Sequence, residues 1–155
     1  MAEPPGPRAP AAAGSPPACE EALRLWRTGL SEDALRLLEA EEDRDPLAAP
    51  LHYLHGLILL DRGRTEEAMA AFRCCTYADQ GFVLGHLAQA CLFVRLGFRD
   101  RAMTALENTV RLVAGLQPDD LVLEGDGPTV RDVLDLASTQ RELLEPGHLP
   151  EVRYG

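Results

Sequence analysis

The chain has 155 residues, which is room for one domain of ordinary size, and 46% of them are hydrophobic, enough to build a core. It carries 15 basic and 25 acidic residues, and the formal net charge of −10 argues against nucleic acid or an anionic membrane as a partner. No apolar run reaches the roughly 20 residues that span a bilayer, and the start of the chain lacks the apolar core of a signal peptide. The 4 cysteines suggest no paired framework, so the sequence predicts a reduced, cytoplasmic protein.

Residues 1–17 are expected to form a disordered tail rich in proline and alanine. They hold 6 prolines and bury too little apolar surface to order themselves. Ser15 is predicted to cap the helix that follows, because proline is tolerated in the first helical turn, where Pro16 and Pro17 would lie.

The chain that follows is built on a repeat of 34 residues. Five positions recur in three units, as a small residue, a large apolar one, a glycine, another small residue and another large one: Ala22, Gly56 and Ala90; Leu25, Leu59 and Phe93; Gly29, Gly63 and Gly97; Ala34, Ala68 and Ala102; Leu38, Phe72 and Leu106. Two antiparallel helices approach closely only where small side chains face each other, with large ones filling the space above and below. The glycine falls where the first helix stops, a position that favours positive φ.

Each unit is therefore expected to contain two helices. The predicted units and their helices cover, in order, about 15–48 (helices 18–28 and from Ser31), about 49–82 (helices 50–61 and 65–78) and about 83–116 (helices 82–96 and 99–114). Ser31 and Thr65 are predicted to cap the second helices of the first two units.

A polar loop over 117–128 is predicted to lead to one more helix over 129–145. Thr129 and Asp132 have the spacing of a capping box. Apolar residues follow along one side of this helix, as a repeat array needs to cover its last unit: Val130, Val133, Leu134, Ala137 and Leu144. Residues 146–155 are expected to be a flexible tail. The predicted fold class is all-α, with three tetratricopeptide helix-turn-helix repeats stacked as a short solenoid plus a C-terminal capping helix.

The ordered part also resembles one subtype of tetratricopeptide domain, the C-terminal repeat domain of bacterial chemotaxis-receptor (CheR-type) methyltransferases. Four stretches carry the resemblance: LHYLHGLILLDRGRTEEAMAAF, TYADQGFVLGHLA, LENTVRLVAGLQPDD and EGDGPTVRDVLDLA. In that family the last three stretches tend to carry residues found here as Tyr77, Asp79, Phe82, His86, Asn108, Asp126, Gly127 and Thr129. The methyltransferase chemistry of such proteins lies in a separate upstream domain. Here no Gly-rich loop follows a strand, so the resemblance implies a regulatory module without methyl transfer.

The polar side chains predict neither catalysis nor a metal site. His52 and His55 lie three residues apart on a predicted helix, but no carboxylate or cysteine recurs at a suitable spacing beside them. His52 and His86 share one repeat position, where packing is the preferred interpretation, and Cys74 and Cys75 point in different directions from their helix. The acids of the loop lack the alternation of a calcium loop: Asp119, Asp120, Glu124 and Asp126. We expect no catalytic residue, no cofactor and no metal.

The candidate site is a groove along the first helices of the units, which line the concave face in tetratricopeptide folds. The repeat register places thirteen residues there: Leu23, Trp26, Arg27, Tyr53, Leu54, Leu57, Leu60, Asp61, Leu87, Ala88, Cys91, Val94 and Arg95. Most are apolar, which favours an amphipathic helix or an extended apolar segment over a C-terminal carboxylate. The alternative is that the last helix covers these side chains, or that they pack between units.

The sequence thus predicts a non-catalytic adaptor or scaffold that binds a protein or peptide, with no nucleic acid, membrane or small-molecule substrate. The resemblance implies a bacterial chemosensory or related signalling pathway. Two alternatives stay open: a regulatory subunit acting in trans with a separate methyltransferase, and a secretion-type tetratricopeptide chaperone.

Overall fold

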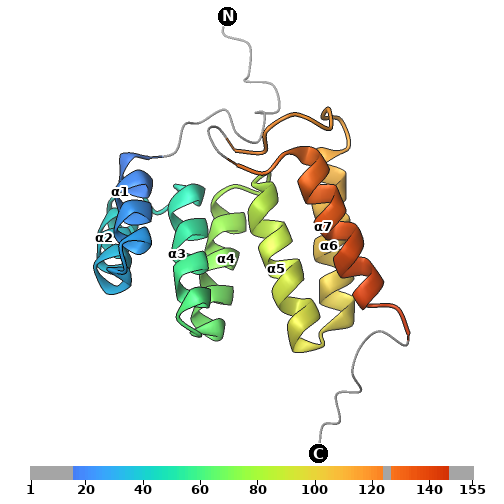
Figure 1. Cartoon of the computed structure of the whole chain (residues 1–155), viewed down its shortest axis with the longest axis horizontal. Helices are drawn as coiled ribbons and strands as arrows, with labels where there is room; N and C mark the ends of the chain where they lie inside the picture. Colours follow the sequence, from blue (N-terminus) through green and yellow to red (C-terminus); the bar gives the residue numbers. More distant parts are fainter. Residues whose placement is uncertain (1–15, 124–126, 147–155) are drawn as a thin grey trace, which may run out of the picture.

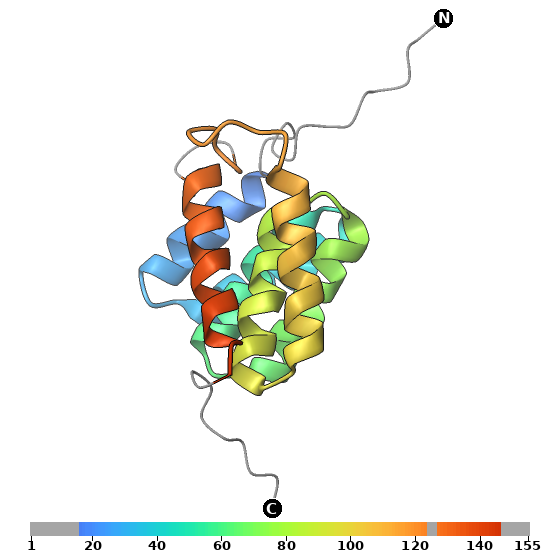
Figure 2. The same ribbon diagram turned by 90° about the vertical axis from the view of Figure 1, so that its right-hand side faces the viewer.

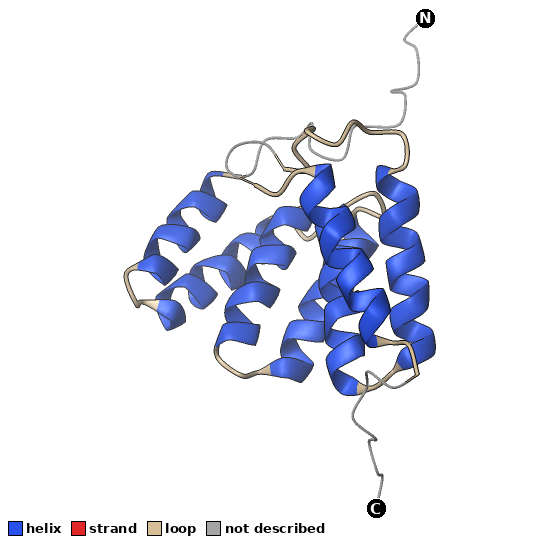
Figure 3. Cartoon of the chain, turned by 45° about the vertical axis from the view of Figure 1, so that its right-hand side comes forward, coloured by secondary structure: helices blue, strands red, loops and turns tan. Residues whose placement is uncertain are grey.

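A computed structural model of the chain describes residues 16–123 and 127–146, and these form seven α-helices and no β-strand (Figure 3). The helices are α1 (Pro17–Arg27), α2 (Ser31–Arg44), α3 (Ala49–Asp61), α4 (Thr65–Ala78), α5 (Val83–Leu96), α6 (Arg99–Val113) and α7 (Val130–Leu143). The all-α prediction is confirmed. Ser15, most of the expected N-terminal tail, Glu124, Asp126 and most of the expected C-terminal tail lie outside the described residues. In the described ranges, no helix is both long and apolar enough to cross a membrane.

Helices α1 to α6 pack as three successive pairs, α1 with α2, α3 with α4 and α5 with α6 (Figure 1). The pairs stack side by side along the molecule, so α1, α3 and α5 form one face and α2, α4 and α6 the other. We call these the first-helix face and the second-helix face. The stacking gives a continuous core that runs through all three pairs.

The three repeat glycines end the first helix of each pair in the left-handed conformation. Their φ angles are 85° at Gly29, 75° at Gly63 and 80° at Gly97, as the sequence predicts. In each turn the amide of the residue after the glycine donates to a carbonyl five residues back, from Leu30 to Leu25 at 2.8 Å and at the two equivalent positions at 2.9 Å. This Schellman motif satisfies carbonyls that the helix end leaves without a partner.

The predicted caps at Ser31 and Thr65 are wrong. Both residues already belong to their helices, and the capping positions are taken by Leu30 and Arg64, without a side-chain hydrogen bond. The glycine turn leaves only one linking residue before the next helix, and that residue is the one whose carbonyl starts the new helix. The capping box at Thr129 is present, because its hydroxyl accepts from the amide of Asp132, whose carboxylate accepts from the amide of Thr129 at 2.8 Å.

The small repeat positions allow the two helices of a pair to touch. The middle unit shows it most plainly: Phe72 of α4 is fully buried, and its ring contacts Gly56 of α3. A Cβ atom built on Gly56 would lie 2.4 Å from a ring carbon of Phe72, inside van der Waals contact. In the flanking units the same pair is an alanine and a leucine, and all four side chains are buried: Ala22 with Leu38, and Ala90 with Leu106.

Helix α7 covers the end of the array, packed against both α5 and α6 (Figure 2). The loop before it is tied back by hydrogen bonds from the amide of Val130 to Asp120 and from Arg131 to Pro118, each 2.9 Å. Most residues on the predicted apolar side of α7 are buried. Leu134 is the exception, because its position on the helix faces solvent. The buried residues on this side are Val130, Val133, Ala137 and Leu144.

Replacing Gly56 with alanine tests the close contact. In the parent chain, Gly56→Ala is expected to lower the free energy of unfolding by about 1–3 kcal/mol, because the added methyl group overpacks the ring of Phe72. In a Phe72→Leu background the same change should cost less or stabilise, because the clash is relieved and alanine favours the helix by about 0.5–1 kcal/mol over glycine. Urea unfolding of the four proteins measures both values. Equal costs in the two backgrounds would show that this contact does not limit the packing.

The turn glycines should resist substitution because of their backbone angle and not because of space. Nothing lies within 4 Å of a Cβ built on Gly63 or on Gly115, but only Gly63 has a positive φ. Gly63→Ala is therefore expected to lower the free energy of unfolding by about 1–2 kcal/mol, the cost of a left-handed residue with a Cβ. Gly115→Ala, the matched control, should be neutral in the same urea titration. A neutral Gly63→Ala would contradict the assigned turn.

Candidate partner-binding site

The predicted groove contains a hollow of about 210 Å³ between α3 and α5 on the first-helix face. The lining includes many of the residues chosen from the repeat register: Tyr53, Leu57, Leu60, Leu87, Ala88, Cys91 and Arg95. Phe72, Leu84 and Leu92 form more of its wall. The register brings these side chains together because residues 34 apart take equivalent places on α3 and α5.

Leu136 of α7 also lines this hollow, and sequence reasoning did not include it. Its side chain is 41% exposed, so it borders the hollow and leaves it open to solvent. Leu136 falls three residues after the buried Val133, a helical spacing that could have drawn attention to it. The direction in which α7 approaches α5, however, cannot be predicted from local sequence patterns. The last helix therefore both covers the third unit and supplies one wall of the hollow.

The other predicted groove residues lie outside the hollow. Leu54 and Val94 are buried in the core, and Leu23 is half-buried against it. The indole nitrogen of Trp26 donates to a carboxylate oxygen of Asp61 at 2.9 Å, a bond that joins α1 to α3. Arg27 is exposed. The first unit thus contributes a polar link beside the hollow and not part of its lining.

Tyr53 is the aromatic anchor of the hollow. Its ring lies 5.5 Å from that of Phe82 and 6.1 Å from that of Phe72, centre to centre, in tilted contacts. Burial, with smaller effects from Cys75 and Cys91, raises the pKa of Tyr53 to about 12, so the hydroxyl stays neutral. Burial also raises the pKa of the Cys91 thiol at the edge of the hollow, which disfavours the reactive thiolate. The site has the chemistry of an apolar receptor, with Arg95 at its rim.

The two histidines considered as metal ligands are held by a carboxylate that the sequence analysis did not find. Glu42 of α2 reaches across to α3, and its Oε1 lies 2.8 Å from Nδ1 of His55 and 3.4 Å from Nδ1 of His52. The Nε2 of His52 lies 2.7 Å from the carbonyl of Pro46 and so donates to it. The spacing of residues around the histidines did not indicate this carboxylate, because Glu42 comes from the preceding helix. Among the described residues no group of His, Cys, Asp and Glu has the geometry to hold a metal ion.

This cluster joins the first unit to the second through charge. Burial opposes ionisation of Glu42, but hydrogen bonds from His52 and His55, and their charges, outweigh it and lower the pKa of Glu42 to about 2. The hydrogen bond to Glu42 raises the pKa of His52 above its ordinary 6.5, against burial and with help from the Pro46 carbonyl. Both ring nitrogens of His52 face acceptors, which the imidazolium form satisfies.

The stability of the chain should depend on pH through this cluster. The raised pKa of His52 contributes stability in full below its unfolded value near 6.5, and the contribution is lost as pH rises through the folded value. The lowered pKa of Glu42 contributes in full above its unfolded value of 4.5, and is lost as pH falls toward about 2. The free-energy gap between the parent and Glu42→Gln should therefore be largest between pH 4.5 and 6.5.

Urea unfolding of the parent and of Glu42→Gln from about pH 4.5 to about pH 9 measures this gap. Glu39→Gln, an exposed change on the same helix, is the matched control and should show no such trend. A gap that stays constant over that range would show that the His52 charge does not contribute.

Comparisons with known proteins agree with this architecture. Residues 19–74 match the tetratricopeptide repeat family. No curated protein sequence matches the chain. Among solved structures, the chain is similar to the type III secretion translocator chaperone SycD of Yersinia enterocolitica, with a TM-score of 0.65 and 16% sequence identity over 81% of each chain. The fold is a tetratricopeptide-like helical solenoid, and the resemblance to the methyltransferase-linked subtype stays a prediction.

Proposed function

We propose that this chain is a non-catalytic adaptor that binds an apolar segment of a partner protein in the hollow between α3, α5 and α7. The observation that carries the proposal is the hollow itself, an open apolar site of about 210 Å³ lined by Tyr53, Leu57 and Leu136. Burying aliphatic side chains is favourable by about 25 cal/mol per Å² of apolar surface, and binding energy at such sites concentrates in a few large anchors. Tetratricopeptide folds bind protein partners in general, which supports the same conclusion.

The biological setting has two candidates that use the same site. The sequence resemblance to chemotaxis-methyltransferase repeat domains supports a cytoplasmic adaptor in a chemosensory or related signalling pathway, acting in trans on a separate methyltransferase or other component. The similarity to SycD over most of both chains supports a secretion-type chaperone, since SycD is described as a translocator chaperone. An adaptor should select one segment of a partner, whereas a chaperone should accept several apolar segments.

Leucine-to-aspartate changes inside and outside the hollow test the proposal. Apolar peptides selected from a displayed random library against the parent are measured by fluorescence anisotropy with each variant. Leu57→Asp should weaken binding by more than about 1 kcal/mol, because it places a charge in an apolar site. Leu47→Asp should have no effect, because Leu47 is 65% exposed and lies outside the hollow. Circular dichroism first establishes that both variants fold.

Thiol protection locates the bound peptide independently. Cys91 lines the hollow, whereas Cys74 of α4 is exposed and is not among the lining residues. A bound peptide should slow the alkylation of Cys91 and leave that of Cys74 unchanged. If Leu57→Asp folds and binds at parental strength, or if Cys91 is not protected, the hollow is not the partner site. Binding of many unrelated apolar peptides would favour the chaperone over the adaptor.

A further inference from the structure

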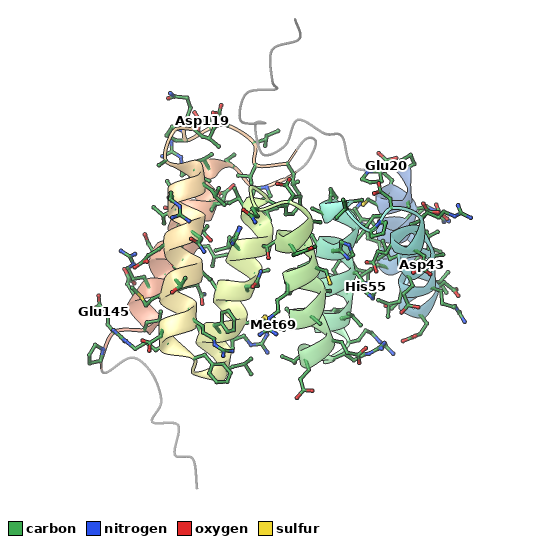
Figure 4. All side chains as sticks on the ribbon, turned by 180° about the vertical axis from the view of Figure 1, so that it is seen from behind. Glu20, Asp43, His55, Met69, Asp119 and Glu145 are labelled. Atoms are coloured by element: carbon green, nitrogen blue, oxygen red, sulfur yellow. The ribbon has the colours of Figure 1, made fainter. Side chains whose placement is uncertain are left out.

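A second, larger hollow region lies on the opposite side of the molecule, between α4 and α6. Two adjoining hollows of about 370 and 700 Å³ share Thr76, His86 and Asn108, and we call them together the α4–α6 cleft. Helix α5 forms the floor with His86 and Gln89, and α4 and α6 form the walls. The second-helix face is turned toward the viewer in Figure 4. This cleft is independent of the apolar hollow on the first-helix face.

The cleft is basic although the protein is strongly acidic. Its lining includes Arg73, Arg101 and Arg111, and Asp100 is the one acidic residue among the lining side chains. None of the three arginines forms an ion pair with a described residue, whereas arginines elsewhere do, such as Arg24 with Glu21 and Arg64 with Glu67. Arg111 donates to the side-chain oxygen of Asn108, and Arg101 lies 5.6 Å from the centre of the Phe98 ring. Their charges are available to a ligand.

The repeat supplies an internal comparison, because the preceding units have an equivalent surface 34 residues earlier. There the positions of Arg73 and Arg101 are Glu39 and Glu67, and that of Tyr77 is Asp43. Two arginines of the cleft thus stand where the earlier surface has glutamates, whereas Arg111 takes the place of Tyr77 and Asp100 that of Glu66. Solenoid geometry does not require this reversal, since the earlier surface forms the same fold without it.

The earlier surface also shows what fills the space beside the histidine. His52 and His86 are equivalent, and each places Nε2 on the carbonyl of an equivalent residue, at 2.7 Å and 2.8 Å. Beside His52 the remaining space holds the carboxylate of Glu42. Beside His86 the equivalent residue is the shorter Thr76, and the 370 Å³ hollow lies there instead. A carboxylate supplied by another molecule would lie beside His86, in the place that Glu42 takes beside His52.

We propose that the α4–α6 cleft binds a short acidic segment of a partner protein, with one of its carboxylates beside His86 and others on Arg73, Arg101 and Arg111. Arg101 and Arg111 are about 15 Å apart along α6 at about 1.5 Å per residue, which is too far for one compact anion. An extended chain covers that distance with about five residues. Tyr77, 83% exposed at one end of the cleft, offers a ring face to an apolar side chain of the segment.

A nucleic-acid strand fits this surface less well than a short peptide. Glu39, Asp43 and Glu66 are exposed on the same face beyond the cleft, so a long polyanion would meet repulsion there. A peptide of about five acidic residues stays within the basic region.

The test uses the full chain and a fluorescein-labelled peptide of about eight residues in which glutamate alternates with alanine. Anisotropy should show saturable binding that weakens as salt rises, and the same peptide with glutamine in place of glutamate should not bind. Arg73→Gln and Arg111→Gln should each weaken binding about three- to tenfold. Arg141→Gln removes the same charge from exposed α7 and should have no effect.

Thr76→Glu places within the chain a carboxylate equivalent to Glu42, which lies between the first and second units. It should abolish peptide binding while the protein still unfolds cooperatively, whereas Thr139→Glu, which adds the same charge on α7, should leave binding unchanged. Leu57→Asp on the first-helix face should also leave it unchanged, so a failure of the proposed apolar site is distinguishable from a failure here. If Thr76→Glu does not fold, the binding affinities of the arginine variants test the proposal.

Three results with the peptides, and one with RNA, would each overturn the proposal. The glutamate peptide does not bind, or the glutamine peptide binds equally well, or the arginine variants bind at parental strength. A short single-stranded RNA that binds more tightly than the glutamate peptide at the same salt concentration would show that the cleft recognises phosphates and not an acidic protein segment.

Discussion

The contact between Gly56 and Phe72 sets how closely the two helices of the middle pair approach each other. With no side chain at Gly56, the fully buried ring of Phe72 packs directly on the backbone of α3 and brings α3 and α4 together. The hollow on the first-helix face opens beside this pair, between α3 and α5. Phe72 itself forms part of the wall of that hollow. The same aromatic side chain therefore links core packing to the candidate binding site.

The two faces of the solenoid differ in chemistry because they are built from different helices of each pair. The first helices present Tyr53, Leu57 and Leu87 around an apolar hollow, and α7 closes one side of it with Leu136. The second helices present charged and amide groups, with arginines around one cleft and acids around its equivalent. The two proposed sites together would hold two segments at once, one apolar and one acidic. Such an arrangement is consistent with the proposed role as an adaptor.

Polar links supplement the apolar core where one unit packs against the next. Glu42 joins α2 to His52 and His55 of α3, and Trp26 of α1 donates to Asp61 of α3. Apolar contacts tolerate sliding better than hydrogen bonds do, because hydrogen bonds require defined distances and angles. These polar links therefore fix the position of the first unit relative to the second. The second and third units are joined by the amide of Gln89, which donates to Thr76 at 2.9 Å.

The sequence by itself determined the class of fold and the positions of its turns. A period of 34 residues, with a glycine, small residues and large residues in constant phase, predicts two helices in each unit because these features act between residues close together in the chain. The positive φ angles at Gly29, Gly63 and Gly97 and the capping box at Thr129 are local in the same sense. The register also placed Tyr53, Leu57 and Leu87 on one face.

Only the tertiary structure decided which side chains meet across units. Glu42 and His52 belong to different helices, and no short-range spacing indicates that a carboxylate would lie between two imidazoles. Leu136 lies outside the repeat, so its place beside the hollow depends on how α7 packs against α5. The open space beside His86 exists because Thr76 is shorter than the glutamate at the equivalent position. Contacts of this kind depend on how whole helices pack against each other, and local sequence patterns do not predict that packing.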